Sequence, residues 1–209
     1  MQYRIKEVKP NIFAVIVKDK YDRAMLFCRF QEYYESPNSK FREKNFSIWD
    51  YMKWYSDKYG RGFSYGADWT GFNIPWKVVN ACICKLNKFE TPYDHIMNEI
   101  SYEVGRKSTN GYIIACKDTK GDTFKHEVCH GLYYTDAAYR KKVDAVTKQL
   151  PKEHYDIFKK NLMEMGYATK VIDDEIQAYL QCDYKHKNFA KGVPLKHRTK
   201  YNKLYATHN

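Results

Sequence analysis

One stretch of eight residues decides the fold and the chemistry expected of this chain: Lys125-His126-Glu127-Val128-Cys129-His130-Gly131-Leu132. Two histidines four positions apart lie on one face of an α-helix, because residues i and i+4 are neighbours across a helical turn. His126 and His130 are therefore expected to bind a single metal ion together. Glu127 projects beside them, where its carboxylate can accept a proton from a water molecule on that metal.

The residues around this stretch favour a helix that is buried on one side. No proline interrupts it, and Val128, Cys129 and Leu132 supply apolar side chains. We expect the helix to begin with a side-chain N-cap from one of three residues: Thr119, Asp122 or Thr123. The alternative is a surface helix whose two histidines pair with nearby acids.

The pattern His126-Glu127-x-x-His130 resembles the zinc-binding motif of the zincin metalloproteases. In that class the two histidines bind Zn²⁺, a third protein ligand completes the set, and the glutamate is the general base. The resemblance covers residues 111–184 and does not extend to residues 1–110. It implies a zincin-like α+β fold with the motif on its active-site helix.

The first candidate for the third metal ligand is Glu175, in the segment Asp173-Asp174-Glu175-Ile176-Gln177-Ala178-Tyr179-Leu180. This segment resembles the gluzincin pattern, in which a second helix carries a glutamate ligand. In thermolysin-like members, the residue before that glutamate and an acid one turn later support the histidines. Asp174 matches the first position, whereas Tyr179 replaces the acid at the second. The resemblance thus implies Glu175 as a ligand and Tyr179 as an oxyanion donor; the alternative is ordinary acidic enrichment in a first helical turn.

Two other candidates imply different relatives. Asp136 lies ten residues after His126, where metzincins carry their third ligand, but Tyr133 replaces the glycine of their turn. A helix N-cap is the other interpretation of Asp136. His154 begins a segment that resembles the H-G-x-x-F segment of SprT-like proteases, which act on proteins crosslinked to DNA, although Tyr155 replaces that glycine.

The bulk composition indicates a structured protein. Its 209 residues are 44% hydrophobic and 17% aromatic, which favours a packed core over disorder. No run approaches the roughly 18 apolar residues of a membrane span, and the N-terminus lacks the apolar core of a signal peptide. The six cysteines form no C-x-x-C pair. We therefore expect a reduced, cytoplasmic protein, and the Lys- and Tyr-rich composition hints at a microbial source or a virus or phage acting in its host.

The positive charge is concentrated at the C-terminal end. Residues 184–209 contain seven lysines and arginines and no acid, so they carry +7 of the net +11. A basic tail of this kind suits nucleic acid or an acidic partner protein. The alternative is a solvated tail that aids solubility.

Hydrophobic periodicity predicts a mixed first half and a helical second half. Residues 3–8 alternate weakly, and strands are expected at residues 12–17, 78–86 and 111–116. Helices are expected at residues 22–35, 48–59, 92–104, 137–150, 151–165 and 171–184. Strand 111–116 lies directly before the motif helix and is predicted to bind a substrate peptide by β-addition. The Gly- and aromatic-rich segment 60–75 predicts a lid, a base-stacking surface or an aromatic core beneath an ordered loop.

These features predict one compact α+β chain with an N-terminal lobe (1–110), a zincin catalytic core (111–184) and a basic tail (185–209). The predicted function is a zinc-dependent metallopeptidase that hydrolyses a polypeptide with Glu127 as general base. His126, His130 and Glu175 are the expected Zn²⁺ ligands. Two alternatives stay open: a non-catalytic zincin-fold protein that binds nucleic acid or a partner through its tail, and a SprT-like protease acting on DNA-bound proteins.

Overall fold

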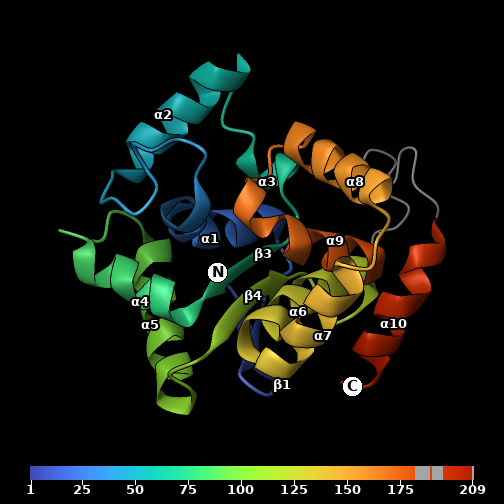
Figure 1. Cartoon of the computed structure of the whole chain (residues 1–209). Coiled ribbons are helices and arrows are strands. Elements are labelled where there is room, and N and C mark those ends of the chain that lie inside the picture. The colour runs from blue at the N-terminus through green and yellow to red at the C-terminus, as the bar shows by residue number, and fades with distance from the viewer. Residues whose placement is uncertain (182–188, 190–194, 209) are drawn as a thin grey trace. The chain divides into compact units, whose positions relative to one another are not determined.

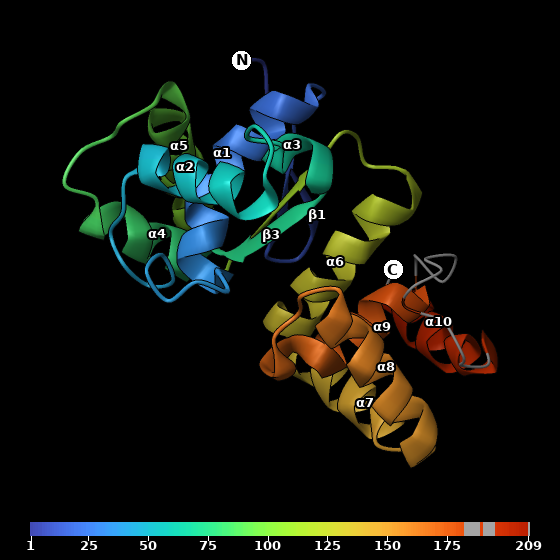
Figure 2. The same cartoon turned by 90° about the horizontal axis from the view of Figure 1, so that it is seen from above.

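The computed structural model describes residues 1–181, 189 and 195–208 (Figures 1 and 2). The chain forms two compact units, Met1–Thr119 and Lys120–Asn209. The first unit combines a four-stranded sheet with helices, and the second is helical throughout its described residues. The protein is therefore α+β, as the sequence predicts.

The sheet of the first unit has the strand order β1-β2-β4-β3. Its strands are β1 (Arg4–Lys9), β2 (Ile12–Ile16), β3 (Phe72–Pro75) and β4 (Tyr112–Cys116). Strands β2 and β4 pair in parallel, and the outer strands pair antiparallel to them. Every residue of β2 and β4 is buried, which is typical of central parallel strands. The strands predicted at residues 12–17 and 111–116 are confirmed, and the weakly alternating residues 3–8 contribute most of β1.

Strand β4 cannot take up a substrate peptide in the way that the sequence predicts. It pairs with β2 on one edge and with β3 on the other, so both of its edges are already hydrogen-bonded. Addition of a peptide strand requires an open edge. The prediction of β-addition at residues 111–116 is therefore wrong.

Five helices belong to the first unit: α1 (Lys20–Glu35), α2 (Ile48–Tyr59), α3 (Tyr65–Asp68), α4 (Trp76–Lys85) and α5 (Pro92–Lys107). Ser47 caps α2 as predicted, and a left-handed Gly60 (φ 63°) ends it. Helix α4 corrects the strand predicted at residues 78–86. Its β-branched residues suggest a strand, but Val79 and Cys82 meet the core at the i, i+3 spacing of a helix.

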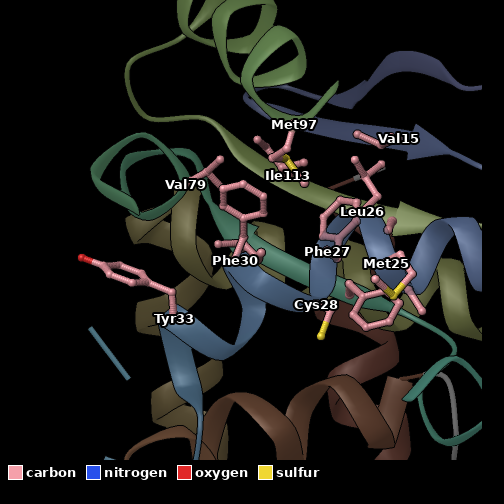
Figure 3. Close-up of a cluster of buried hydrophobic side chains, with 14 of the residues drawn as sticks. Val15, Met25, Leu26, Phe27, Cys28, Phe30, Tyr33, Val79, Met97 and Ile113 are labelled. Atoms are coloured by element: carbon pink, nitrogen blue, oxygen red, sulfur yellow. The ribbon is translucent and has the colours of Figure 1, made fainter. Parts of the chain in front are cut away.

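The core of the first unit is built around α1. This helix is buried along most of its length and contacts β3, β4, α4 and α5. Figure 3 shows Leu26, Phe27 and Phe30 of α1 among the side chains of this core, together with Ile113 of β4 and Met97 of α5. The buried residues of α1 also include Arg23, Arg29 and Glu32, and each of these charged groups has a hydrogen-bond partner, as buried charges require.

The aromatic segment at residues 60–75 packs into the core of the first unit. The rings of Phe63 and Tyr65 stack on each other, and Tyr65 also stacks on Phe72. Tyr65 and Phe72 are each only 2% exposed, so neither ring face is open to a nucleic-acid base. The prediction of an aromatic core is confirmed, although Trp69 stays exposed.

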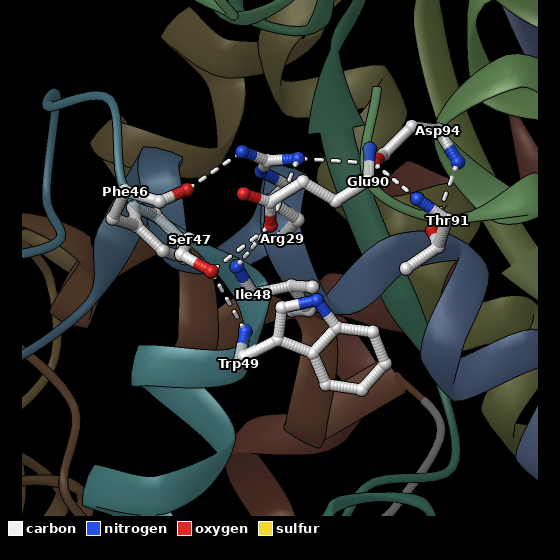
Figure 4. A network of polar contacts seen from close by, with 8 residues as sticks. All are labelled: Arg29, Phe46, Ser47, Ile48, Trp49, Glu90, Thr91 and Asp94. Carbon is white, nitrogen blue, oxygen red and sulfur yellow. Dashed lines mark hydrogen bonds and ion pairs between the residues drawn. The ribbon is translucent and has the colours of Figure 1, made fainter. Parts of the chain in front are cut away.

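A buried polar network fixes the start of α2 (Figure 4). Arg29 of α1 donates to the Asp94 carboxylate at 2.9 Å and to the Phe46 carbonyl at 2.7 Å. The Glu90 carboxylate accepts from the Ser47 hydroxyl and from the Ile48 backbone N–H. Within the first unit, its side chains bind one another and backbone groups near the start of α2, so we interpret the network as structural.

The second unit begins with the motif helix. It contains α6 (Gly121–Thr135), α7 (Ala137–Thr147), α8 (Lys152–Glu164), the 3₁₀ turn η1 (Thr169–Val171), α9 (Ile172–Gln181), the 3₁₀ turn η2 (Leu195–His197) and α10 (Arg198–Ala206). Helices α6 to α9 confirm the predicted helices, within the described residues. The predicted side-chain N-cap of α6 is wrong, because Lys120 occupies that position without a capping hydrogen bond.

Part of the basic tail is folded as α10, which packs against α7 and α9. Tyr201 is fully buried, with its hydroxyl 3.0 Å from that of Thr147. Arg198 donates to the backbone carbonyls of Leu180 and Gln181 at 3.1 and 3.3 Å. It thereby satisfies carbonyls at the C-terminal end of α9.

The rest of the tail, at 185–188, 190–194 and 209, lies outside the described residues. No helix within the described ranges has the length and apolar character needed to span a membrane.

Candidate metal centre

Helix α6 presents the two motif histidines to one point. The Nε2 atoms of His126 and His130 are 3.1 Å apart, and their ring centroids are separated by 4.8 Å. Both residues are buried, at 8% and 3% exposure. The i, i+4 spacing therefore brings the imidazoles together as the sequence predicts.

Helix α9 adds a carboxylate to this pair. Its Glu175 is also buried, and its two oxygens lie 3.7 Å from His126 Nε2 and 3.6 Å from His130 Nε2. One ligand atom from each of the three residues falls within 4.8 Å of the others. The helices approach closely where the small side chains of Cys129 and Ala178 meet, both fully buried.

Asp174, directly before this glutamate, holds one of the two imidazoles. Its Oδ2 lies 2.9 Å from Nδ1 of His130, which donates the hydrogen bond. In the neutral ring this places the proton on Nδ1 and leaves the Nε2 lone pair facing His126 and Glu175. Carboxylates commonly hold metal-binding histidines in this way.

The cluster contains more carboxylates than imidazoles. Burial alone would lower the pKa of His130, but Asp174 and Glu175 outweigh it and raise that pKa well above its ordinary value. Burial raises the pKa of Glu175 to about 7, although the two imidazoles act in the opposite direction. Three carboxylates, Glu127 included, thus surround two imidazoles, an arrangement that a divalent cation would balance.

The residues fit a metal ion on two further counts. Glu175 Oε2 is buried and accepts no hydrogen bond within the described part of the chain. The 3.1 Å separation of the two imidazole nitrogens is near the edge length of about 3.3 Å for a tetrahedron with zinc–ligand bonds of about 2.0 Å, and each nitrogen lies 3.6 or 3.7 Å from a different oxygen of Glu175. Two imidazole nitrogens and one carboxylate oxygen also form a donor set that zinc accepts readily.

Tyr179 of α9 meets the cluster through its ring. The ring lies edge-on to His126 at 4.8 Å and stacks on Phe189 at 4.8 Å. Its hydroxyl is 3.0 Å from that of Tyr167, in the loop after α8. Burial, followed by the charge of Glu175, raises the pKa of Tyr167 well above its ordinary value. The Tyr167 phenol is therefore a neutral hydrogen-bonding group at physiological pH.

The structure gives the other two ligand candidates different partners. Asp136 accepts from the backbone N–H groups of Ala138 and Tyr139, and so caps α7. His154 of α8 lies beside His197, with 2.8 Å between Nδ1 and Nε2. Neither belongs to the cluster formed with Glu175.

Two residues near the cluster are not identified as site residues from the sequence. Tyr167 follows a helix-ending Gly166 with a φ of 101°, and nothing in its local sequence marks it as a neighbour of the metal ligands. Gln177 donates to Asp174 at 2.9 Å. Its position three residues after Asp174 places the two side chains on one helical face, which is a signal that the sequence does carry.

No protein-family model, curated protein or solved structure matches this chain.

Proposed function

We propose that this chain is a zinc-dependent metallopeptidase whose centre lies on α6 and α9. One observation carries the proposal: His126, His130 and Glu175 converge within 4.8 Å, with a further acid, Glu127, adjacent in sequence to the first ligand. A purely structural site needs closed coordination and has no use for an additional buried carboxylate. Three protein ligands and a carboxylate base instead match a site that acts on water.

Each residue of the centre has a separate role in the proposed reaction. His126, His130 and Glu175 would hold the metal, and Asp174 keeps Nε2 of His130 available for it. Bound zinc would lower the pKa of water and polarise a peptide carbonyl. Glu127 accepts the proton from the attacking water and delivers it to the leaving amine nitrogen.

Tyr179 is the proposed hydrogen-bond donor to the oxyanion. Its ring is fixed between His126 and Phe189, and its hydroxyl is oriented by Tyr167. A donor that is fixed before the reaction stabilises developing charge without reorganising. Replacing Tyr179 with Phe is expected to lower kcat by about 10- to 100-fold and to leave the zinc content unchanged.

The test compares Glu127→Gln with Glu164→Gln, an exposed glutamate of α8 as the matched control. Zinc content is measured by atomic emission, and cleavage is followed with an unfolded protein substrate such as casein. We expect Glu127→Gln to keep stoichiometric zinc and lose at least about 100-fold in rate, the size of a general-base contribution. Wild-type protein with stoichiometric zinc and no cleavage of any unfolded protein or peptide would contradict the proposal, and so would full activity in Glu127→Gln.

A second candidate function is nucleic-acid binding by the basic tail, which exposed lysines of η2 and α10 favour. Lys196, Lys200 and Lys203 are exposed at i, i+4 and i+7, and residues 195–206 contain no acid. DNA affinity falls with salt, and the slope of log K against log[salt] has a magnitude of about 0.9 for each phosphate contact. Changing all three lysines to Gln should therefore lower that magnitude by up to about 2.7. Arg198 is kept, because it caps α9. An unchanged slope would refute this candidate.

A further inference from the structure

A chain of polar side chains leads away from the metal centre to a third helix. Tyr139 of α7 donates its hydroxyl to Oε1 of Gln177 at 2.8 Å. Gln177 donates from Nε2 to Oδ1 of Asp174 at 2.9 Å. The other oxygen of Asp174 accepts from Nδ1 of His130 at 2.9 Å. The chain thus connects α7, α9 and α6.

We infer that Tyr139 and Gln177 are positioning residues of the metal centre, which fix Asp174 and, through it, the metal-binding face of His130. The inference rests on the metal centre of the proposed function and adds two residues to it. Their hydrogen bonds in this chain of side chains join them to each other and to Asp174.

The direction of each hydrogen bond supports this role. A glutamine amide has one accepting and one donating end, and here Tyr139 faces the first and Asp174 the second. The reversed amide would turn a carbonyl oxygen toward a carboxylate. Tyr139 therefore selects the orientation in which Gln177 can hold Asp174.

Burial makes this arrangement rigid. Tyr139 and Gln177 are both 0% exposed, so a lost partner is not replaced by bulk water. Asp174, in contrast, has 20% of its side chain exposed and would be able to turn toward solvent. The bond from Gln177 opposes that rotation and keeps Oδ2 on His130.

The same helix offers a matched control. Gln181 lies one turn after Gln177, is 6% exposed and donates to the backbone carbonyl of Tyr201. It is a buried, hydrogen-bonded glutamine of α9 with no bond to Asp174 in the structure. Replacement by Met in either position retains side-chain length and removes the amide.

The experiment compares Gln177→Met, Tyr139→Phe and Gln181→Met in the full chain. Zinc affinity is measured by competition with a chromophoric chelator, and Co²⁺ replaces zinc for a visible absorption spectrum of the ligand geometry. Gln177→Met is expected to raise the zinc Kd at least about tenfold, as loss of a supporting hydrogen bond does at metal sites. Its Co²⁺ bands are expected to shift. Tyr139→Phe should act in the same direction and less strongly, and Gln181→Met should leave Kd within about twofold.

The outcomes separate this inference from the proposed function. Equal zinc Kd values and Co²⁺ spectra for wild type and Gln177→Met would overturn it, even if the variant melts at a lower temperature. If Gln177→Met does not fold, Tyr139→Phe, which removes a single oxygen, decides in the same way. Wild type that binds neither metal overturns the inference together with the metal centre. Metal binding without peptide cleavage overturns only the peptidase.

Discussion

Replacing Asp174 with Asn tests the electrostatic design of the centre most directly. The Asp174 carboxylate faces two donors, Nδ1–H of His130 at 2.9 Å and Nε2–H of Gln177 at 2.9 Å. Asparagine has almost the same shape but offers only one oxygen and one NH₂ group. One of the two donors must therefore face another donor.

Both ways of relieving that clash harm metal binding. If His130 changes tautomer, its proton moves to Nε2, the atom that faces Glu175. If the Gln177 side chain instead turns away from residue 174, its amide loses a buried hydrogen-bond partner. Loss of a charge-assisted hydrogen bond costs about 1.5–3 kcal/mol, which corresponds to a roughly 10- to 100-fold rise in the zinc Kd.

The assay is a chelator competition at pH 7.5 on Asp174→Asn and on Asp173→Asn as its control. Asp173 precedes Asp174 in the same helical turn, and its carboxylate accepts from the Tyr155 hydroxyl instead of a metal ligand. Both variants remove one negative charge, so the control reports the long-range charge effect alone. Equal Kd values for the two variants would refute the role of Asp174 as the tether of His130.

Three further predictions concern stability. Because the folded pKa of Glu175 is about 7, above its unfolded value, the stabilisation from its bound proton is lost as pH rises from about 4.5 through 7. In urea unfolding, the metal-free protein should therefore be less stable at pH 8 than at pH 5 by on the order of 3 kcal/mol. Excess zinc should reverse much of that loss at pH 8. A free energy of unfolding that does not change with pH would contradict this prediction. Arg198→Gln should lower stability by about 1–2 kcal/mol, and Lys203→Gln by less than about 0.5, in thermal melts. Burial raises the pKa of Glu32, so Glu32→Gln should raise the melting temperature at pH 8 more than at pH 5; an equal gain would point to packing instead.

Local signals were sufficient for most elements of the fold. The Ser47 cap and Gly60 define both ends of α2, and the apolar run at residues 12–17 yields the buried strand β2. These features depend on nearby residues, which a single sequence displays. The α+β class follows from the same patterns.

Features that depend on tertiary pairing were harder to predict. The β-branched residues of 78–86 suit a strand or a helix, and the helix is decided by packing of Val79 and Cys82 against the core. The inner place of β4 depends on β3 joining it from residues 72–75, within a segment that the sequence indicates as loop. Strand order is a long-range property that periodicity does not encode.

The candidate site divides in a similar way. The pairing of His126 with His130 is fixed by helical spacing, and the choice of Glu175 came from a resemblance to a pattern of acids on a second helix. Tyr167 reaches Tyr179 only through the turn after α8, and Tyr139 reaches Gln177 only because α7 packs on α9. Contacts made across helices need the folded chain.

Docking of α10 has a consequence for cooperativity between the tail and the metal. Arg198 binds the last carbonyls of α9, and the same helix carries Glu175 near its start. A ligand that draws α10 away from α9 and thereby loosens the hold of Glu175 on the metal would bind the metal-free protein more tightly, and by thermodynamic reciprocity metal would weaken that ligand by the same factor. A ligand that leaves α10 docked would show no such coupling, so zinc dependence of binding distinguishes the two kinds of tail partner.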